Sequence, residues 1–124
     1  MELITRVLIG LIAFIHCYIM WLEMFAWTTR GPKAFNKPAA ELEQSKTLAA
    51  NQGLYNGFLA AGLLWTFSID NYYWQNNISL FFLTCIAIAS MYGSLTVTRK
   101  IFYIQATPAL VAIILILINR FTWV

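Results

Sequence analysis

A long stretch with almost no charge constrains the fold of this chain most strongly. Between Leu48 and Thr98 the only charged residue is Asp70. Across all 124 residues, 60% are hydrophobic and 10% are charged, whereas about a quarter of a soluble domain is charged. This composition is typical of a membrane protein and argues against both a water-soluble domain and a disordered chain. The lipid bilayer is therefore the first expected partner.

Four apolar segments have the length of about 20 residues that a helix needs to cross a bilayer. Their apolar runs are continuous rather than alternating, which favours helices over the strands of a barrel. The first segment is too long for a signal peptide and contains His16 and Glu23, so we expect a permanent span. The prediction is an all-α, integral membrane four-helix bundle, with residues 1–124 forming one transmembrane domain and spans at 3–27, 48–67, 78–97 and 101–118.

The basic residues predict an orientation. Six of the eight would lie on one side of the membrane, and the positive-inside rule places that side in the cytoplasm. Both termini are then expected outside the cytoplasm. The net charge of +3 needs no nucleic-acid partner, because positive flanks at a membrane surface account for it. The six residues are Arg30, Lys33, Lys37, Lys46, Arg99 and Lys100.

Two prolines and a row of small residues indicate local features of the helices. Pro38 stands at a helix-start position, so the second span is expected to begin early. Pro108 cannot donate to the carbonyl of Ile104, which predicts a bend in the fourth span. Small residues recur every four positions in the second span and would let another helix approach closely, within the chain or in a second copy: Ala49, Gly53, Gly57 and Ala61.

Glu23 needs an explanation because an ionisable group in lipid is costly unless it is neutralised, paired or turned toward water. His16 lies seven residues earlier on the same helix face, about 10 Å away along the axis. Counting helical rise from the cytoplasmic ends places several polar side chains at a similar depth. The candidate ligand or proton site comprises Glu23, His16, Asn51, Gln52, Tyr55, Asn56 and Gln105.

We expect Glu23, Asn51, Tyr55, Asn56 and Gln105 to meet in one cavity, with His16 at its deeper end. The alternative is a network of interhelical hydrogen bonds that only fixes the register of the helices. A single His and a single Glu cannot fill a usual set of three or four metal ligands, so no metal is expected. No cofactor is predicted, and no catalytic residue can be assigned.

Three segments resemble a known family. They are HCYIMWLEMFAW at 16–27, LAANQGLYNGFLAAGL at 48–63 and QATPAL at 105–110. Together they are similar to the small bacterial membrane proteins of the domain-of-unknown-function 1304 family, and the resemblance covers essentially the whole chain. It implies a four-helix fold in the bacterial cytoplasmic membrane but supplies no activity.

Three functions are compatible with these patterns. The leading hypothesis is a small proton-linked solute transporter that works as a homo-oligomer, since four short helices enclose little volume. An intramembrane acid/base enzyme acting on a lipidic substrate is the second, although about 10 Å between His16 and Glu23 excludes a directly bonded dyad. The third is a structural or regulatory subunit of a membrane complex.

Overall fold

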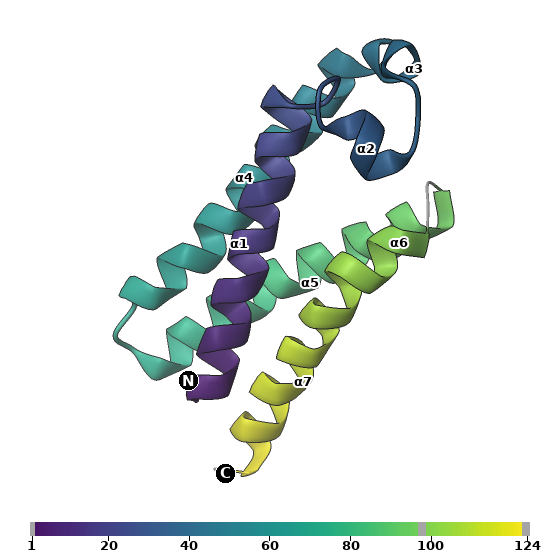
Figure 1. Cartoon of the computed structure of the whole chain (residues 1–124). Coiled ribbons are helices and arrows are strands. Elements are labelled where there is room, and N and C mark those ends of the chain that lie inside the picture. Colours follow the sequence, from purple (N-terminus) through teal and green to yellow (C-terminus); the bar gives the residue numbers. More distant parts are fainter. Residues whose placement is uncertain (1, 97–98, 123–124) are drawn as a thin grey trace. The chain divides into compact units, whose positions relative to one another are not determined.

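The computed structural model describes residues 2–96 and 99–122, and these residues are helical with short connections (Figure 1). Within these two ranges the all-α prediction is confirmed, with four long helices and no strand. The fourth of them runs without interruption through α6, η2 and α7. The elements are α1 (Leu3–Phe25), α2 (Gly31–Phe35), α3 (Ala39–Glu43), α4 (Lys46–Trp65), η1 (Thr66–Ser68), α5 (Tyr72–Thr96), α6 (Arg99–Ile101), η2 (Phe102–Ala106) and α7 (Thr107–Thr122).

Three of these helices are long and apolar enough to cross a membrane, namely Leu3–Phe25, Tyr72–Thr96 and Tyr103–Phe121 among the described residues. α4 is as long as a span, but Lys46 and the amides of Asn51, Gln52 and Asn56 reduce its apolar character. The chain is therefore a multi-pass membrane protein, and its apolar helices imply a lipid bilayer around it.

The chain forms two compact units, which we describe separately. The central unit comprises residues 14–60, and the terminal unit comprises residues 1–13 together with 61–124. The expectation of a single four-span domain stays a prediction.

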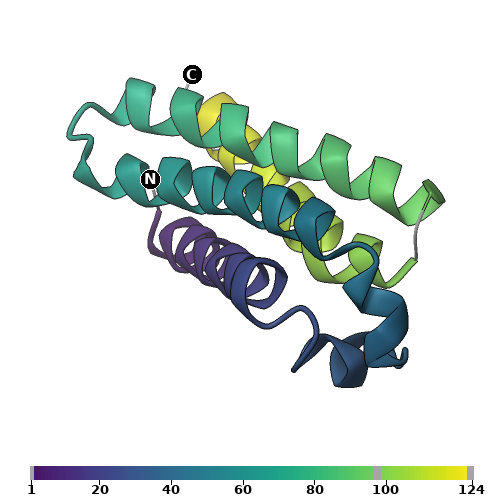
Figure 2. The ribbon, with the colours of Figure 1, turned by 90° about the horizontal axis from the view of Figure 1, so that it is seen from above.

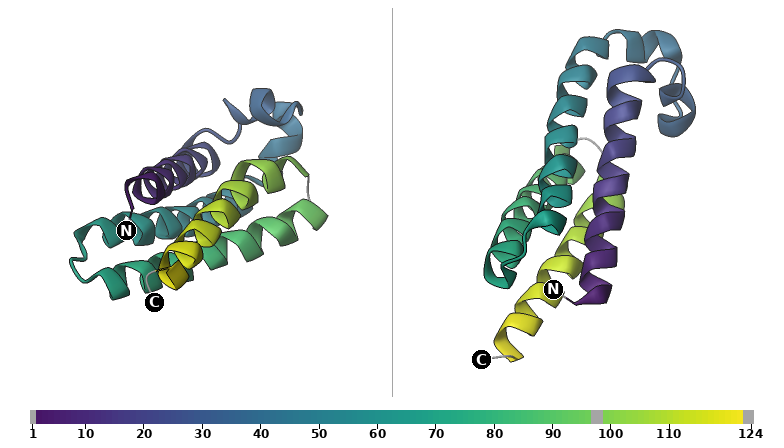
Figure 3. Two further views of the ribbon diagram at one scale, coloured as in Figure 1. Left: turned by 90° about the horizontal axis from the view of Figure 1, so that it is seen from below. Right: turned by 90° about the vertical axis from the view of Figure 1, so that its left-hand side faces the viewer.

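In the central unit, the second half of α1 is followed by α2 and α3, which lead into α4 (Figure 3, right). Pro38 is the N-cap of α3, so a helix starts at the proline as expected. However, this helix ends at Glu43 and α4 begins separately at Lys46. The early start predicted for the second span is thus a short helix of its own.

In the terminal unit, α5 packs along η2 and α7 (Figure 2). Their buried residues include Leu83 and Ile86 on α5 and a row of small residues, Ala106, Ala109 and Ala112, on the following helix. Small side chains allow the two helices to approach closely, as in other membrane helix pairs.

α5 begins six residues before the predicted span. Asn71 explains the difference, because its Oδ1 accepts a hydrogen bond of 3.0 Å from the backbone N–H of Trp74 at the helix start. Gln75 is buried and donates through Nε2 to the carbonyl of Thr66 at 3.0 Å. Residues 72–77, which precede the predicted third span, therefore form the first turns of a helix. The predicted end of this span, at residue 97, lies outside the described residues.

The helix around Pro108 departs from regular α geometry where the proline predicts a disturbance. Residues Phe102–Ala106 form a π-helical turn directly before α7, which includes Pro108 in its first turn. Such turns are a common way for a helix to accommodate a missing backbone hydrogen bond.

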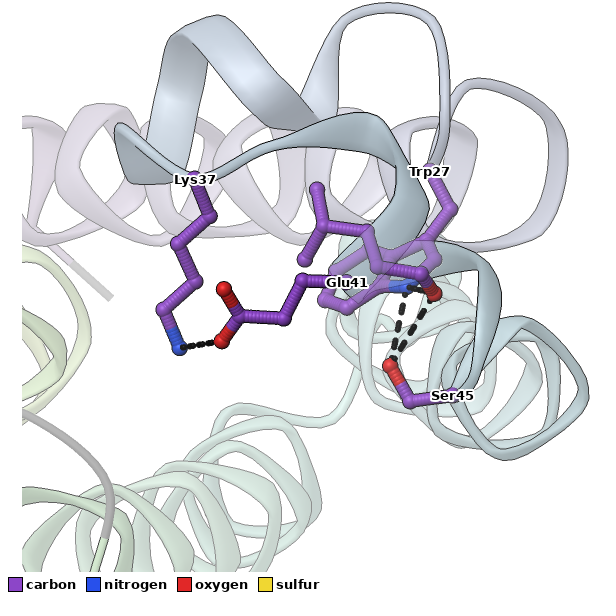
Figure 4. Close-up of polar contacts among 5 residues, drawn as sticks. Trp27, Lys37, Glu41 and Ser45 are labelled. Carbon is purple, nitrogen blue, oxygen red and sulfur yellow. Dashed lines mark hydrogen bonds and ion pairs between the residues drawn. The ribbon is translucent and has the colours of Figure 1, made fainter.

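Trp27 ties the segment between α1 and α4 together. Its indole Nε1–H lies 2.9 Å from the carbonyl of Leu42 and 3.2 Å from Oγ of Ser45 (Figure 4), and its ring lies 5.2 Å from that of Phe35.

We expect Trp27→Phe to keep the ring pair and lose the hydrogen bonds, at a cost of about 1 kcal/mol. Tryptic cleavage after Lys33 in the folded protein should then accelerate about fivefold. Ser45→Ala keeps the 2.9 Å bond between Trp27 and Leu42 but removes both 3.2 Å bonds of the Ser45 hydroxyl, to Trp27 and to the Leu42 carbonyl, and should change the rate less. Equal rates in Trp27→Phe and the parent protein would contradict this role.

Candidate functional site

The polar pair at the centre of the candidate site joins α1 and α4 within the central unit. Asn56 donates a hydrogen bond of 2.6 Å through Nδ2 to Oε1 of Glu23. Glu23 lies two residues before the end of α1 at Phe25, closer to the helix end than the predicted span implied. This bond brings together two of the residues selected from the sequence.

Two glycines on α4 allow the backbones to come close enough for this contact. A Cβ atom on Gly53 would lie 2.6 Å from Cγ of Met24, 3.0 Å from Cβ of Glu23 and 3.1 Å from the carbonyl oxygen of Met20. A Cβ on Gly57 would lie 2.6 Å from Sδ of Met20. At Gly53 a larger residue would press on the backbone of α1, whereas at Gly57 the end of the Met20 side chain would have to move. At Gly53 and Gly57, the row of small residues on α4 therefore packs against α1 of the same chain.

The amide of Asn56 is held by two acceptors. Besides the Glu23 carboxyl group, its Nδ2 contacts the carbonyl oxygen of Gln52, one turn earlier on α4, at 3.1 Å. Because one acceptor belongs to its own helix, the amide group has a fixed direction toward α1. Asn56 thus positions the Glu23 side chain from a neighbouring helix.

His16 and the other polar residues of α4 are placed differently. His16 is buried on α1, with 1% of its surface exposed, about 10 Å along the helix from Glu23. Asn51 and Tyr55 are exposed and lie roughly 160° around α4 from Gly53, at 100° per residue. Asn51 contacts the carbonyl of Thr47 on its own helix at 3.5 Å. The structure does not bring Asn51 or Tyr55 to Glu23, so their part in a shared site stays a prediction.

Gln52 and Gln105 complete the predicted set. The side chain of Gln52 is exposed, while its backbone carbonyl accepts from Asn56. Gln105 belongs to the terminal unit, within the π-helical turn, where its Oε1 lies 3.2 Å from the hydroxyl of Ser90 on α5. The expectation that Gln105 joins Glu23 is therefore still a prediction.

A second group of polar contacts, which the sequence reasoning missed, joins α5 and α7. Asn119 donates to the hydroxyl of Tyr72 at 2.9 Å, and Nη2 of Arg120 donates to Oδ1 of Asn77 at 2.6 Å. The Arg120 guanidinium also lies over the ring of Tyr73, 4.9 Å from its centroid. In the sequence, the three consecutive amides at residues 75–77 could have indicated these contacts, but they precede the predicted start of the third span at residue 78. This group links the start of α5 to the end of α7.

Metal-binding side chains do not cluster in the part of the chain that the structure describes, where no three of His, Cys, Asp and Glu gather. Cys17 and Cys85 are free thiols. The chemistry available at the Glu23–Asn56 pair is therefore that of a carboxyl group and an amide: proton exchange and hydrogen bonding to a polar or cationic solute.

Comparison with known proteins identifies the family. Residues 10–117 match the family described as "Protein of unknown function (DUF1304)". The chain is also 37% identical over 117 residues to "Uncharacterized protein YpaA" of Lactococcus lactis subsp. lactis (strain IL1403), covering 92% of this chain and 97% of that protein. No solved structure matches it. The chain thus belongs to the DUF1304 family, as the three sequence segments had indicated.

Proposed function

We propose that the protein is a small proton-linked solute transporter and that Glu23 is its proton-binding group. The observation that carries the proposal is a carboxyl group within an apolar membrane helix that is bonded at 2.6 Å to an amide of another helix. Ionisable residues inside membrane helices are rare and serve function by default, because placing them there is costly.

The hydrogen bond with Asn56 suits a group that exchanges protons. An amide N–H can donate to a carboxylate and equally to the carbonyl oxygen of a protonated carboxylic acid. Asn56 can therefore hold the Glu23 side chain in place in both states. If the pair only fixed the register of the two helices, two amides would do this equally well, without the cost of an ionisable group in the membrane.

The cellular location, the topology and the oligomeric state of the protein are parts of the same proposal. We place the protein in a bacterial cytoplasmic membrane, in keeping with its bacterial relative, with both termini outside the cytoplasm. A homo-oligomer would supply the enclosed volume that four helices alone lack. Its contacts would use surfaces other than Gly53 and Gly57, because α1 already covers these glycines.

The test is proton movement in proteoliposomes that contain the purified protein and an internal pH-sensitive dye. A panel of cationic, zwitterionic and neutral solutes is added outside, and one class should drive a pH change that protein-free vesicles do not show. In Glu23→Gln that change should fall to the protein-free background, because the amide cannot exchange a proton. Flux equal to that of the parent protein in Glu23→Gln would exclude Glu23 as the proton site, and a folded protein inert to the whole panel would contradict transport.

Two matched variants separate the function of the pair from its structural role. Glu23→Gln keeps an oxygen that can accept from Asn56, so the free energy of unfolding should stay within about 0.5 kcal/mol of the parent value. Asn56→Ala keeps the carboxyl group but removes the donor, and should cost about 1 kcal/mol. Unfolding in mixed detergent micelles measures both. If Glu23→Gln destabilised the protein as much as Asn56→Ala while flux persisted, registry would be the role of the pair.

A further inference from the structure

The connector, residues 26–46, links the end of α1 to the start of α4 within the central unit. α1 is long and apolar enough to span the bilayer, so the chain leaves the hydrocarbon region where this helix ends. The connector therefore begins at the level of the lipid headgroups.

A small apolar core keeps the connector folded at this level. Ala26 and Leu42 are buried, and a Cβ on the buried Gly31 would lie 3.1 Å from Cδ1 of Leu42. Trp27 closes the fold by donating to the Leu42 carbonyl (Figure 4). Since Trp27 at one end is bonded to Leu42 near the other, the connector is held against the helix ends rather than extended into water. Phe35 remains 38% exposed, which gives the connector an apolar side chain at its surface.

The charges of the connector are unbalanced. It carries four exposed basic residues, against two exposed acidic ones, Glu41 and Glu43. Lys37 forms an ion pair with Glu41 at 3.8 Å between Nζ and Oε1, visible in Figure 4. Arg30, Lys33 and Lys46 add three further positive charges on the same folded segment.

We propose that the connector is a binding surface for the headgroups of anionic phospholipids. Basic clusters next to a membrane helix attract anionic lipids, and each Lys or Arg near the surface strengthens the association about fivefold. Here the basic residues lie on the connector, whose apolar core holds them at the depth of the headgroups. The exposed ring of Phe35 belongs to the same segment. Charge complementarity identifies the occupant as a lipid with a net negative headgroup, such as phosphatidylglycerol. This inference is independent of transport.

The test uses the full-length protein in bilayer nanodiscs that contain phosphatidylcholine and a trace of phosphatidylglycerol with a photoreactive headgroup. Illumination followed by peptide mapping should place cross-links within residues 26–46. Unlabelled phosphatidylglycerol should compete for this labelling, whereas phosphatidylcholine and inorganic phosphate should not. In the triple variant Arg30→Gln, Lys33→Gln and Lys46→Gln, connector labelling should fall more than tenfold if each charge contributes about fivefold.

A charge-conserving variant provides the control. Arg30→Lys, Lys33→Arg and Lys46→Arg alters the same three side chains and keeps their charges, so connector labelling should remain at the parent level. Circular dichroism of both variants reports whether the helices are intact. Labelling that persists in the glutamine variant, or that phosphatidylcholine competes as well as phosphatidylglycerol, would overturn the proposal. Competition by inorganic phosphate at equal concentration would also overturn it, since the surface would then bind a free anion rather than a lipid.

Discussion

Gly53→Leu is expected to lower the free energy of unfolding by about 3 kcal/mol and to separate α1 from α4 around the candidate site. The first added carbon alone would lie 2.6 Å from Cγ of Met24 and 3.1 Å from the backbone carbonyl of Met20. The methionine side chain can turn away, but the carbonyl moves only with its helix. Overpacking of this kind costs about 1–3 kcal/mol. Displacing α1 also breaks the bond between Asn56 and Glu23, which adds about 1 kcal/mol. Reversible unfolding in mixed micelles, followed by circular dichroism, measures the loss.

A matched pair of alanine variants isolates the steric effect. Both Gly53 and Gly10 lie inside helices, where replacing glycine by alanine favours the helix by about 1 kcal/mol. A Cβ on Gly10 would lie 3.8 Å from Cζ of Phe67, an ordinary contact. Gly10→Ala should therefore be neutral or stabilising, while Gly53→Ala should be destabilising. If the two variants proved equally stable, the close approach of α1 and α4 at Gly53 would be refuted.

The existence of the four long helices followed from the sequence, whereas their ends did not. Long apolar runs specify a spanning helix because the backbone must satisfy its hydrogen bonds internally in lipid. A helix end depends instead on individual capping contacts. Asn71 caps α5 and Gln75 bonds to the Thr66 carbonyl, so residues 72–77, which precede the predicted span, are helical. Composition alone cannot distinguish polar residues in a loop from polar residues that face another helix.

The Glu23–Asn56 pair shows which part of the candidate site could be predicted from the sequence. Counting helical rise placed Asn56 one turn deeper than Glu23, near enough to share a site, and the structure joins the two residues. Depth, however, does not specify rotation around the helix axis. Gly53 and Gly57 mark the side of α4 that meets α1, and Asn51 and Tyr55 lie roughly 160° from Gly53. Combining depth with the glycine face would have selected Asn56 and set Asn51 and Tyr55 apart.

Gly62→Val is expected to destabilise the terminal unit by about 3 kcal/mol, because the ring of Phe82 lies directly over this glycine. A Cβ on Gly62 would overlap three ring atoms of Phe82, Cζ, Cε1 and Cε2. A rigid ring cannot bend away as a methionine can, so Phe82 must leave its rotamer or the helices must part. Valine adds two further carbons, and misfits of this size cost about 1–3 kcal/mol or somewhat more. The double variant with Phe82→Ala removes the overlapping ring and should be less destabilised than the sum of the single variants by about 1–2 kcal/mol. Unfolding measurements on the parent, both single variants and the double variant give this coupling directly, and additive losses would show that Phe82 does not cover Gly62.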